Sequence, residues 1–386
     1  MKPIHVLILP SNYPDSQNDI SVSFFREQVL SLKEHILNVG VIHIKLFSFL
    51  NFSKLRLLPD FNYESDNGIN TFRITYIKLV VFSEYFKIKL IKCLGLFYFK
   101  KYIKIYGKPD VIHCHNFHYA AYISELIFDR YQIPFVITEH DSRFFTNNLK
   151  FNLKDISRIA NKASLCLAVS SKFCDLLTHK IPNSPFWHVH HNIVSKIFFE
   201  ENMNLSKKDA FVFISIGRLI KHKNVDLVLK SFKIFNDKYP SSILKIVGDG
   251  PEMNFLKDEV FKLKITNNVV FLGELSRREV VDELKHSHIF VSGSIYETFG
   301  VVFIEALAQG LPVLSTPCEG VFDIVNDQNG IIISSITPSD MSKAMFLIFD
   351  NFDNFNKRQI IDECQFKFSE ETQSKRLIEY YQKVIN

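Results

Sequence analysis

Short apolar runs alternate with longer helix-like stretches along the whole chain, and no other feature constrains the fold as much. Runs such as ILKIV and NVVFL are apolar at nearly every position, which is typical of strands covered on both faces of a parallel sheet. Alternation of strands and helices predicts an α/β fold. Two consecutive series predict two doubly wound, Rossmann-like domains facing a cleft.

The predicted elements set the expected domain boundaries. We expect a first domain over 1–198, a polar linker over 199–209, a second domain over 210–368, and a helix over 369–386 that packs back on the first domain. Helices are expected, for example, at Phe24–Leu37 and Ala120–Tyr131. Strands are expected at Ile4–Leu9, Val41–Phe47, Ile69–Tyr76, Val111–His115, Phe135–Thr138, Leu165–Val169, Trp187–His190, Phe211–Ile216, Ile243–Val247, Val269–Leu272, Ile289–Val291, Val313–Ser315 and Ile331–Ile333.

Length and composition agree with this division. A chain of 386 residues exceeds the size of one ordinary core and suits two domains. No charge-free stretch of 18 apolar residues is present, and the N-terminal apolar run is too short for a signal peptide. The six cysteines form no C-x-x-C pair, which is typical of reduced cysteines in a cytoplasmic protein.

Positive charge is concentrated in the first half. Residues 1–195 hold 23 Lys and Arg against 15 Asp and Glu, and residues 73–108 hold nine basic residues and one acidic residue. Aromatic and aliphatic residues fill the gaps, so this segment could bind an anionic membrane surface, at the inner face of the membrane. A solvated basic face over an ordinary core helix explains it equally well. No nucleic-acid partner is expected, because no reader motif accompanies the charge.

Candidate anion-binding residues follow two strands of the second half. Gly217 lets the chain turn after FVFISI, and Arg218 and Lys223 follow where a phosphate could sit. The next strand ends in a tight turn that contains Gly248 and Gly250. Helix starts after such turns offer unpaired N–H groups to an anion, although a purely structural turn remains an alternative.

Two carboxylates frame an apolar helix start further along. Glu297 and Glu305 are eight residues apart, which in one straight helix would be about 12 Å along the axis and roughly 80° around it. They could therefore not share one small ion, but they could grip two ends of an extended ligand. Carboxylates in such apolar surroundings need hydrogen-bond donors, and sugar hydroxyls are suitable. A surface glutamate plus a helix-capping one is the alternative.

Taken together, these segments resemble a known family. IGRLIKHKN, KIVGDGP, NNVVFLGEL and YETFGVVFIEALAQGLPVLSTPCEG stand in the order and at the spacing of the donor domain of the family 4 glycosyltransferases, which have the GT-B fold. DVIHCHNFHYAAY and VITEHDSRF in the first half also look like segments of that family. GT-B enzymes have two Rossmann-like domains, so the resemblance agrees with the fold expected from the strand pattern.

The resemblance implies a role for each matching residue. Arg218 and Lys223 would hold the donor's diphosphate and stabilise the charge on the leaving nucleotide. Glu297 would hold the transferred sugar, and Glu305 the ribose hydroxyls. His140 matches the family histidine near the reacting sugar. Other donor-binding residues would be Gly217, Gly248, Gly250, Leu272, Gly273 (the last two near the base), Thr298, Phe299, Gly300 and Val301.

Acceptor binding is less well specified. The loop over residues 10–23 contains no glycine, whereas many members of the family have glycine there. Similarly, Gly320-Val321-Phe322-Asp323 stands where Gly-x-Pro-Glu is more usual. The acceptor candidates are Asn12, Tyr13, Ser21, His115 and His118.

No metal or other cofactor is expected. The sequence has no D-x-D motif, and the basic residues and helix starts can neutralise the phosphates. The His-rich segments lack Cys or carboxylate partners at the spacing of a zinc site. No G-x-G-x-x-G follows the first strand, which argues against a nicotinamide oxidoreductase.

The function implied is a retaining glycosyltransferase. It would move a hexose-type sugar from a nucleotide-diphosphate donor, UDP in preference to GDP, to a glycan or lipid-linked acceptor in cell-surface polysaccharide synthesis. A nucleotide-sugar 2-epimerase-like isomerase of the same fold is the alternative.

Overall fold

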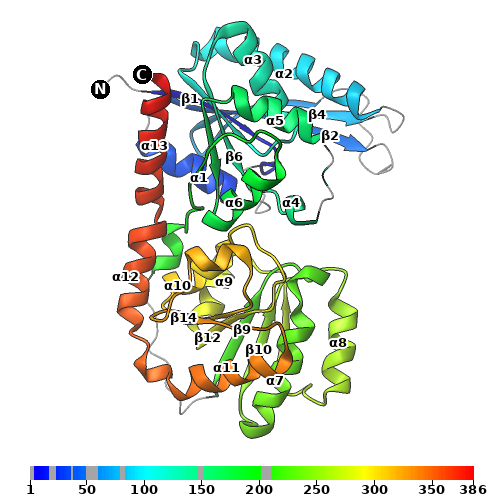
Figure 1. Ribbon diagram of the computed structural model, residues 1–386, viewed down its shortest axis with the longest axis vertical. Helices are drawn as coiled ribbons and strands as arrows, with labels where there is room; N and C mark the ends of the chain where they lie inside the picture. Colours follow the sequence, from blue (N-terminus) through cyan, green and yellow to red (C-terminus); the bar gives the residue numbers. More distant parts are fainter. Residues whose placement is uncertain are drawn as a thin grey trace. The chain divides into compact units, whose positions relative to one another are not determined.

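The computed structural model describes residues 4–16, 23–35, 38–48, 60–78, 83–146, 149, 151–200 and 210–386. The chain divides into two compact units. The first comprises Met1–Asn192 and Gln373–Asn386, and the second Ile193–Thr372 (Figure 1). Each unit has its own sheet and its own core.

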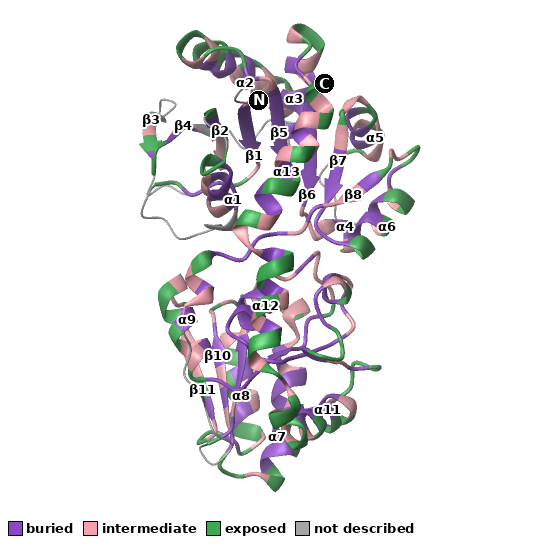
Figure 2. Ribbon diagram, turned by 90° about the vertical axis from the view of Figure 1, so that its left-hand side faces the viewer, coloured by how far each residue is buried: buried purple, intermediate pink, exposed green. Residues whose placement is uncertain are grey.

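The sheet of the first unit has eight strands in the order β3-β4-β2-β1-β5-β6-β7-β8. All neighbours pair in parallel except β3 and β4. Nearly every residue of the central strands is buried, as expected for a sheet covered on both faces (Figure 2). The strands are β1 (His5–Pro10), β2 (Asn38–Ser48), β3 (Asp60–Asp66), β4 (Ile69–Lys78), β5 (Val111–His115), β6 (Phe135–Glu139), β7 (Leu165–Ala168) and β8 (Trp187–Val189).

Strand β3 was not among the expected strands. Its sequence, DFNYESD, is polar, because it is an edge strand that pairs antiparallel with β4 and has little to bury. Asn67 and Gly68 connect the two strands with φ angles of 51° and 80°. Asn-Gly is a strong signal for such a two-residue hairpin turn, so the sequence did contain the information.

Helices cover the first sheet and complete its core. They are α1 (Ser23–Lys33), α2 (Glu84–Tyr106), α3 (Tyr119–Tyr131), α4 (Arg143–Thr146), α5 (Leu153–Lys162), α6 (Ser171–Lys180) and α13 (Glu370–Ile385). Leu377 and Tyr381 of α13 are buried in one cluster with Val6, Ile8 and Phe25. The last helix of the chain is thus part of the core of the first unit.

The second unit is a parallel sheet of six strands in the order β11-β10-β9-β12-β13-β14. Phe213, Phe232 and Phe235 are fully buried in its core. The strands are β9 (Val212–Ile216), β10 (Ile243–Val247), β11 (Val269–Gly273), β12 (Ile289–Ser292), β13 (Val313–Ser315) and β14 (Gly330–Ile332). The helices are η2 (Lys196–Phe199), η3 (Lys221–Lys223), α7 (Val225–Lys238), α8 (Met253–Lys262), α9 (Arg277–Lys285), α10 (Val301–Ala308), η4 (Glu319–Asp323), α11 (Pro338–Asp350), η5 (Phe352–Asn354) and α12 (Lys357–Phe368).

The strand order reverses once in each sheet. In the first unit the reversal lies between β1 and β5, and in the second between β9 and β12. Ligands of open α/β sheets bind beyond the carboxyl ends of the strands at such a reversal. The residues that follow these four strands are therefore the first place to look for a site.

The chain passes between the units after Asn192 and again after Thr372. The expected linker began at residue 199, but Lys196–Phe199 already form η2, which packs on α9 and α10 of the second unit. The rest of the expected linker, 201–209, lies outside the described residues. Among the helices that the structure does describe, none has the length and apolarity needed to cross a membrane.

Candidate active site

The loop after β9 places its cations at the reversal of the second sheet. The N–H of Gly217 donates to the carbonyl of Val247 at 3.0 Å, which ties the loop to the end of β10. Arg218 follows and is exposed. Lys223 ends the short helix η3, where Asn224, with φ of 51°, turns the chain into α7. The two predicted phosphate ligands thus come from one ordered loop.

The loop after β12, on the other side of the reversal, brings Glu297 to Lys223. The Lys223 ammonium forms an ion pair with Oε1 of Glu297. Ser294 donates a hydrogen bond from Oγ to the same oxygen at 2.8 Å, and the carbonyl of Glu297 accepts from the N–H of Gly320 at 2.9 Å. Lys223 and Glu297, predicted separately from the sequence, therefore lie together, and Ser294 is a supporting residue that the sequence analysis missed.

The predicted glycines allow the loops to pack closely. A Cβ on Gly248 would lie 2.0 Å from the carbonyl oxygen of Gly217, and the φ of Gly248 is +124°. A Cβ on Gly250 would lie 2.3 Å from the carbonyl oxygen of Leu219. Side chains at either position would push the loop after β10 away from the loop that contains Arg218.

Helix α10 begins beside Glu297 without a capping side chain. Its N-cap is Gly300, which has a φ of 95° and provides no side-chain acceptor for the first turn. The N–H of Phe303 donates to the carbonyl of Gly300 at 3.0 Å. The start of a helix otherwise offers N–H groups that lack intrahelical acceptors, and such a start favours an anion. Thr298, Phe299 and Gly300 lead directly into this start, and their role in holding sugar and phosphate stays a prediction.

Glu305 lies within α10 and is 3% exposed. Its Oε1 forms an ion pair with Nη1 of Arg277, the first residue of α9. Arg277 was not among the predicted site residues. The sequence did contain a signal for its position at the start of a helix. In S-R-R-E, Ser276 and Glu279 form a capping box that fixes where α9 begins.

Leu272 and Gly273 end β11, four residues before Arg277. Gly273 has a φ of 71°, and its carbonyl accepts from the N–H of Gly248 at 2.7 Å. The segment predicted to contact the base is thus connected to the glycine turn after β10.

The predicted catalytic histidine lies one strand away from the reversal of the first sheet. His140 follows β6, and its N–H donates to Oδ1 of Asn116 at 2.9 Å. Its Nε2 is 3.0 Å from Nδ1 of His115, at the end of β5, so one ring donates to the other. His113, two residues earlier in β5, contacts the hydroxyl of Tyr381 through Nδ1 at 2.7 Å. The C-terminal helix therefore reaches this histidine group.

Burial controls the protonation of these side chains. It lowers the pKa of His113 and of His140 to about 3, and that of His115 well below the ordinary value. The imidazoles are therefore neutral at neutral pH. Burial also raises the pKa of Glu139 to about 8, although three backbone N–H groups donate to its carboxylate at 2.7 to 2.9 Å. His140 can orient a hydroxyl by hydrogen bonding without adding positive charge.

The acceptor candidates differ in their exposure to solvent and in their contacts. Asn12 is exposed, whereas Tyr13 is 3% exposed, with the Arg73 guanidinium 5.3 Å from its ring centre. His115 is buried against His140. His118 lines a cavity of about 20 Å³, room for one water, together with Ser11 and apolar residues of β1, β2 and α3. Ser21 lies outside the described residues.

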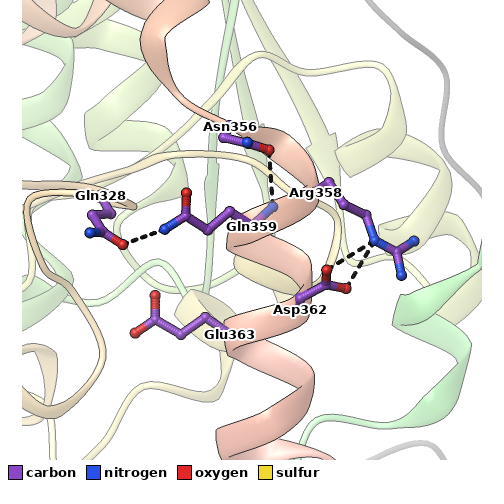
Figure 3. A pocket seen from close by; sticks show the side chains of 6 residues that line it. All are labelled: Gln328, Asn356, Arg358, Gln359, Asp362 and Glu363. Atoms are coloured by element: carbon purple, nitrogen blue, oxygen red, sulfur yellow. Dashed lines mark hydrogen bonds and ion pairs between the residues drawn. The ribbon is translucent and has the colours of Figure 1, made fainter.

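A larger hollow of about 490 Å³ opens on the surface of the second unit. Its polar side chains pair with one another: Gln359 donates to Gln328 at 2.5 Å, and Arg358 pairs with Asp362 at 3.0 Å (Figure 3). It contains none of the predicted site residues. Within the described ranges, no group of three or more His, Cys, Asp or Glu could hold a metal ion.

Two family models match the chain. One described as "Glycosyl transferases group 1" matches residues 197–363, and one described as "Glycosyltransferase Family 4" matches residues 63–195. The first covers the loops that contain Arg218, Lys223 and Glu297, and the second covers His140. The chain belongs to this family of glycosyltransferases and has its GT-B fold, with two Rossmann-like units.

Individual relatives agree with this assignment. An uncharacterized glycosyltransferase of Methanocaldococcus jannaschii is 44% identical over 112 residues, which are 29% of this chain and 27% of that protein. Alpha-monoglucosyldiacylglycerol synthase of Acholeplasma laidlawii is 25% identical over 254 residues, 59% of this chain and 64% of that protein. The matches thus span less than two thirds of these two relatives. The structure of Anabaena HepE in complex with UDP and glucose has a TM-score of 0.72 at 16% identity and covers 98% of this chain and 99% of that one.

Proposed function

We propose that the chain is a retaining hexosyltransferase that uses a UDP-sugar and requires no metal ion. The observation that carries the proposal is the ion pair between Lys223 and Glu297 at the strand reversal of the second unit. In this pair, a lysine that can bind phosphate lies beside a carboxylate that can accept hydrogen bonds from sugar hydroxyls. The pair is at the edge of the sheet where such folds bind ligands. Arg218 and the uncapped start of α10 add positive potential nearby.

The proposed reaction breaks the bond between the sugar C1 and the diphosphate oxygen. The acceptor oxygen forms its bond to C1 on the same face, and its proton passes to the departing phosphate. Arg218 and Lys223 stabilise the charge on the diphosphate, which takes the place of a metal ion. Glu297 accepts hydrogen bonds from the sugar, Glu305 binds the ribose, and neutral His140 orients the sugar. UDP is favoured over GDP because HepE, with the same fold, was solved with UDP and glucose.

The proposed acceptor is a glycan or a lipid-linked glycan of the cell surface, reached at the cytoplasmic face of a membrane. Helix α2 supports this part of the proposal. Its inner side packs in the core through Ile91, Phe99 and Tyr102. Its outer side exposes both apolar and basic side chains, namely Tyr85, Phe86, Lys89, Phe97, Lys100, Lys101, Lys104 and Ile105.

This outer face suits an anionic bilayer. Phe97 is 52% exposed and Ile105 61%, and the ammonium group of Lys101 lies 4.7 Å from the centre of the Phe97 ring. Exposed rings beside lysines can enter the headgroup region while the ammonium groups meet lipid phosphates. The Acholeplasma relative is named for a product with a diacylglycerol anchor, which agrees with an acceptor held in a membrane.

A donor screen tests the proposal. UDP, GDP and ADP are compared by thermal shift with and without EDTA, and we expect UDP alone to raise the Tm, equally under both conditions. UDP-glucose, UDP-galactose and UDP-N-acetylglucosamine are then incubated with the enzyme, and the first sugar anomer released by slow hydrolysis is assigned by proton NMR.

Free UDP together with the α-anomer from an α-linked donor supports a retaining transferase. A first-formed β-anomer would exclude retention. Conversion of the sugar at C2 would instead support the 2-epimerase-like isomerase.

A further inference from the structure

Arg277 has no role in the proposed mechanism, yet it forms a charged contact with Glu305, the proposed ribose ligand. Its guanidinium pairs through Nη1 with Oε1 of Glu305. The Glu305 side chain is 4% exposed and that of Arg277 is 24% exposed, so the arginine is the more accessible partner. A buried carboxylate needs such a partner, because an unpaired charge is costly away from water.

The guanidinium is also held from a second element. It lies 4.7 Å from the ring centre of Phe198, a fully buried residue of η2. The carbonyl of Phe198 accepts a hydrogen bond from Nε2 of Gln309 at 2.6 Å. Gln309 is the C-cap residue of α10, the helix that contains Glu305, so α9, η2 and α10 together fix the position of Arg277.

The location of this contact connects two proposed parts of the donor site. Arg277 comes four residues after Gly273, where the base would bind, and its side chain reaches Glu305, which would bind the ribose. Base and ribose are covalently joined in a nucleotide, so their protein contacts must be held in a fixed relative position. The ion pair joins the segment for the base to the carboxylate for the ribose.

We propose that Arg277 is a positioning residue for the ribose of the donor. This inference rests on the proposed function. The guanidinium binds Oε1 of Glu305 and fixes the plane of the carboxylate, so that Oε2 is directed to accept a hydrogen bond from a ribose hydroxyl. A fixed carboxylate contributes more to binding than a mobile one, because binding then does not have to pay the entropy of ordering the side chain.

The test compares two ligands that differ only in the ribose. Isothermal titration calorimetry measures the Kd of UDP and of 2′,3′-dideoxyuridine diphosphate for the full chain. For the wild type we expect UDP to bind about tenfold or more tightly than the dideoxy ligand. For Glu305→Ala the ratio should fall to about one, because the acceptor of the ribose hydroxyl is gone.

The ratio of the two Kd values, dideoxy ligand to UDP, in Arg277→Ala decides whether the inference holds. We expect it to fall below about threefold, with Arg277→Lys between this value and the wild type, because lysine keeps the charge without the planar fork. Arg278→Ala is the matched control, since Arg278 is the next residue of α9, is exposed and pairs with Glu200. Its ratio should equal that of the wild type.

The outcomes separate this inference from the proposed function. If Arg277→Ala binds both ligands more weakly but keeps the wild-type ratio, Arg277 has only a structural role and the inference is overturned. A wild type that binds UDP and the dideoxy ligand equally also overturns it, while the proposed UDP site stands.

If Arg277→Ala fails to fold, Arg277→Lys decides, because a wild-type ratio in that variant excludes positioning by the planar fork. Failure of the wild type to bind UDP would refute the proposed donor.

Discussion

Lys223 and Glu297 form an ion pair although they follow different strands, β9 and β12, and stand 74 residues apart in the sequence. These two strands flank the reversal of strand order in the second sheet. The pair therefore lies where the topology predicts a ligand site. Each side chain neutralises the charge of the other. A bound diphosphate and sugar would provide new partners for both.

The first prediction concerns this pair. Lys223→Ala and Glu297→Gln should each lower kcat for donor cleavage by about 10²- to 10³-fold, because each removes a charged group that, in the proposed mechanism, would contact the developing transition state. Coupled detection of released UDP measures the rate, and the Tm reports folding. Lys221→Ala, in the same short helix but exposed, is the control. Near-normal turnover in Glu297→Gln would remove Glu297 from the proposed site.

The second prediction concerns the close approach of two loops. Gly248→Ala should destabilise the second unit by about 3 kcal/mol or more, because the new methyl group meets the carbonyl oxygen of Gly217 and φ is positive. Gly107→Ala is the control, since Gly107 also has a positive φ, of 84°, but open space around it. Urea unfolding should show a much larger loss for Gly248→Ala than for Gly107→Ala. Equal losses would mean that the contact with Gly217 is unimportant.

Apolar patterning was sufficient to predict most of the fold. Buried parallel strands such as β5, β10 and β13 were predicted with the bounds that the structure shows, because each is a short run with apolar residues that ends before turn residues. The hairpin strand β3 was missed because an edge strand has few apolar positions. Its Asn67-Gly68 turn was the overlooked signal.

The site could be predicted only where a motif was local. Arg218, Lys223 and Glu297 stand in recognisable loops, and the structure places the last two in contact. Arg277 could not be connected with Glu305 from the sequence, because their 28-residue separation gives no indication that two helices will meet there. The guanidinium of Arg73 lies over the Tyr13 ring, and these two residues are even more remote in sequence.

The third prediction concerns pH. The pKa of His113 is about 3 in the folded chain, against an ordinary value of 6.5, because the side chain is buried. Between these values the unfolded chain binds a proton that the folded chain does not, so stability is full above pH 6.5 and falls as the pH falls toward 3. For His113 alone the loss between pH 7.5 and pH 5 is about 2 kcal/mol. His115 and His190 should add to it, whereas Glu139, with a pKa raised to about 8, binds a proton in the folded chain first and acts in the opposite direction as the pH falls.

Urea unfolding at pH 7.5, 6.5, 5.5 and 5 measures this dependence. His113→Gln should have a shallower decline than the wild type, even if it is less stable at pH 7.5. His179→Gln, which removes an exposed imidazole, is the control. The same pH dependence in the wild type and in His113→Gln would contradict the prediction.

The fourth prediction concerns α2. Replacing Phe97 by Ser together with Lys100, Lys101 and Lys104 by Gln should reduce binding to phosphatidylglycerol vesicles by about tenfold or more, because each lysine near an anionic surface contributes about 1 kcal/mol. Vesicle sedimentation measures binding, with phosphatidylcholine vesicles as the neutral reference. The control replaces Lys257, Lys262 and Lys264, which lie in or next to α8, by Gln. Equal sedimentation of wild type and α2 variant would exclude this helix as the membrane contact.

The most direct test of the proposed donor site is a titration of UDP into the wild type and into a variant with both Arg218→Ala and Lys223→Ala. Calorimetry in the presence of EDTA should show UDP binding to the wild type and an affinity lower by about a hundredfold or more in the variant, because two charge-assisted phosphate contacts are lost. Unchanged affinity in a folded variant would mean that the diphosphate binds elsewhere, and the proposed donor site of the second unit would be wrong.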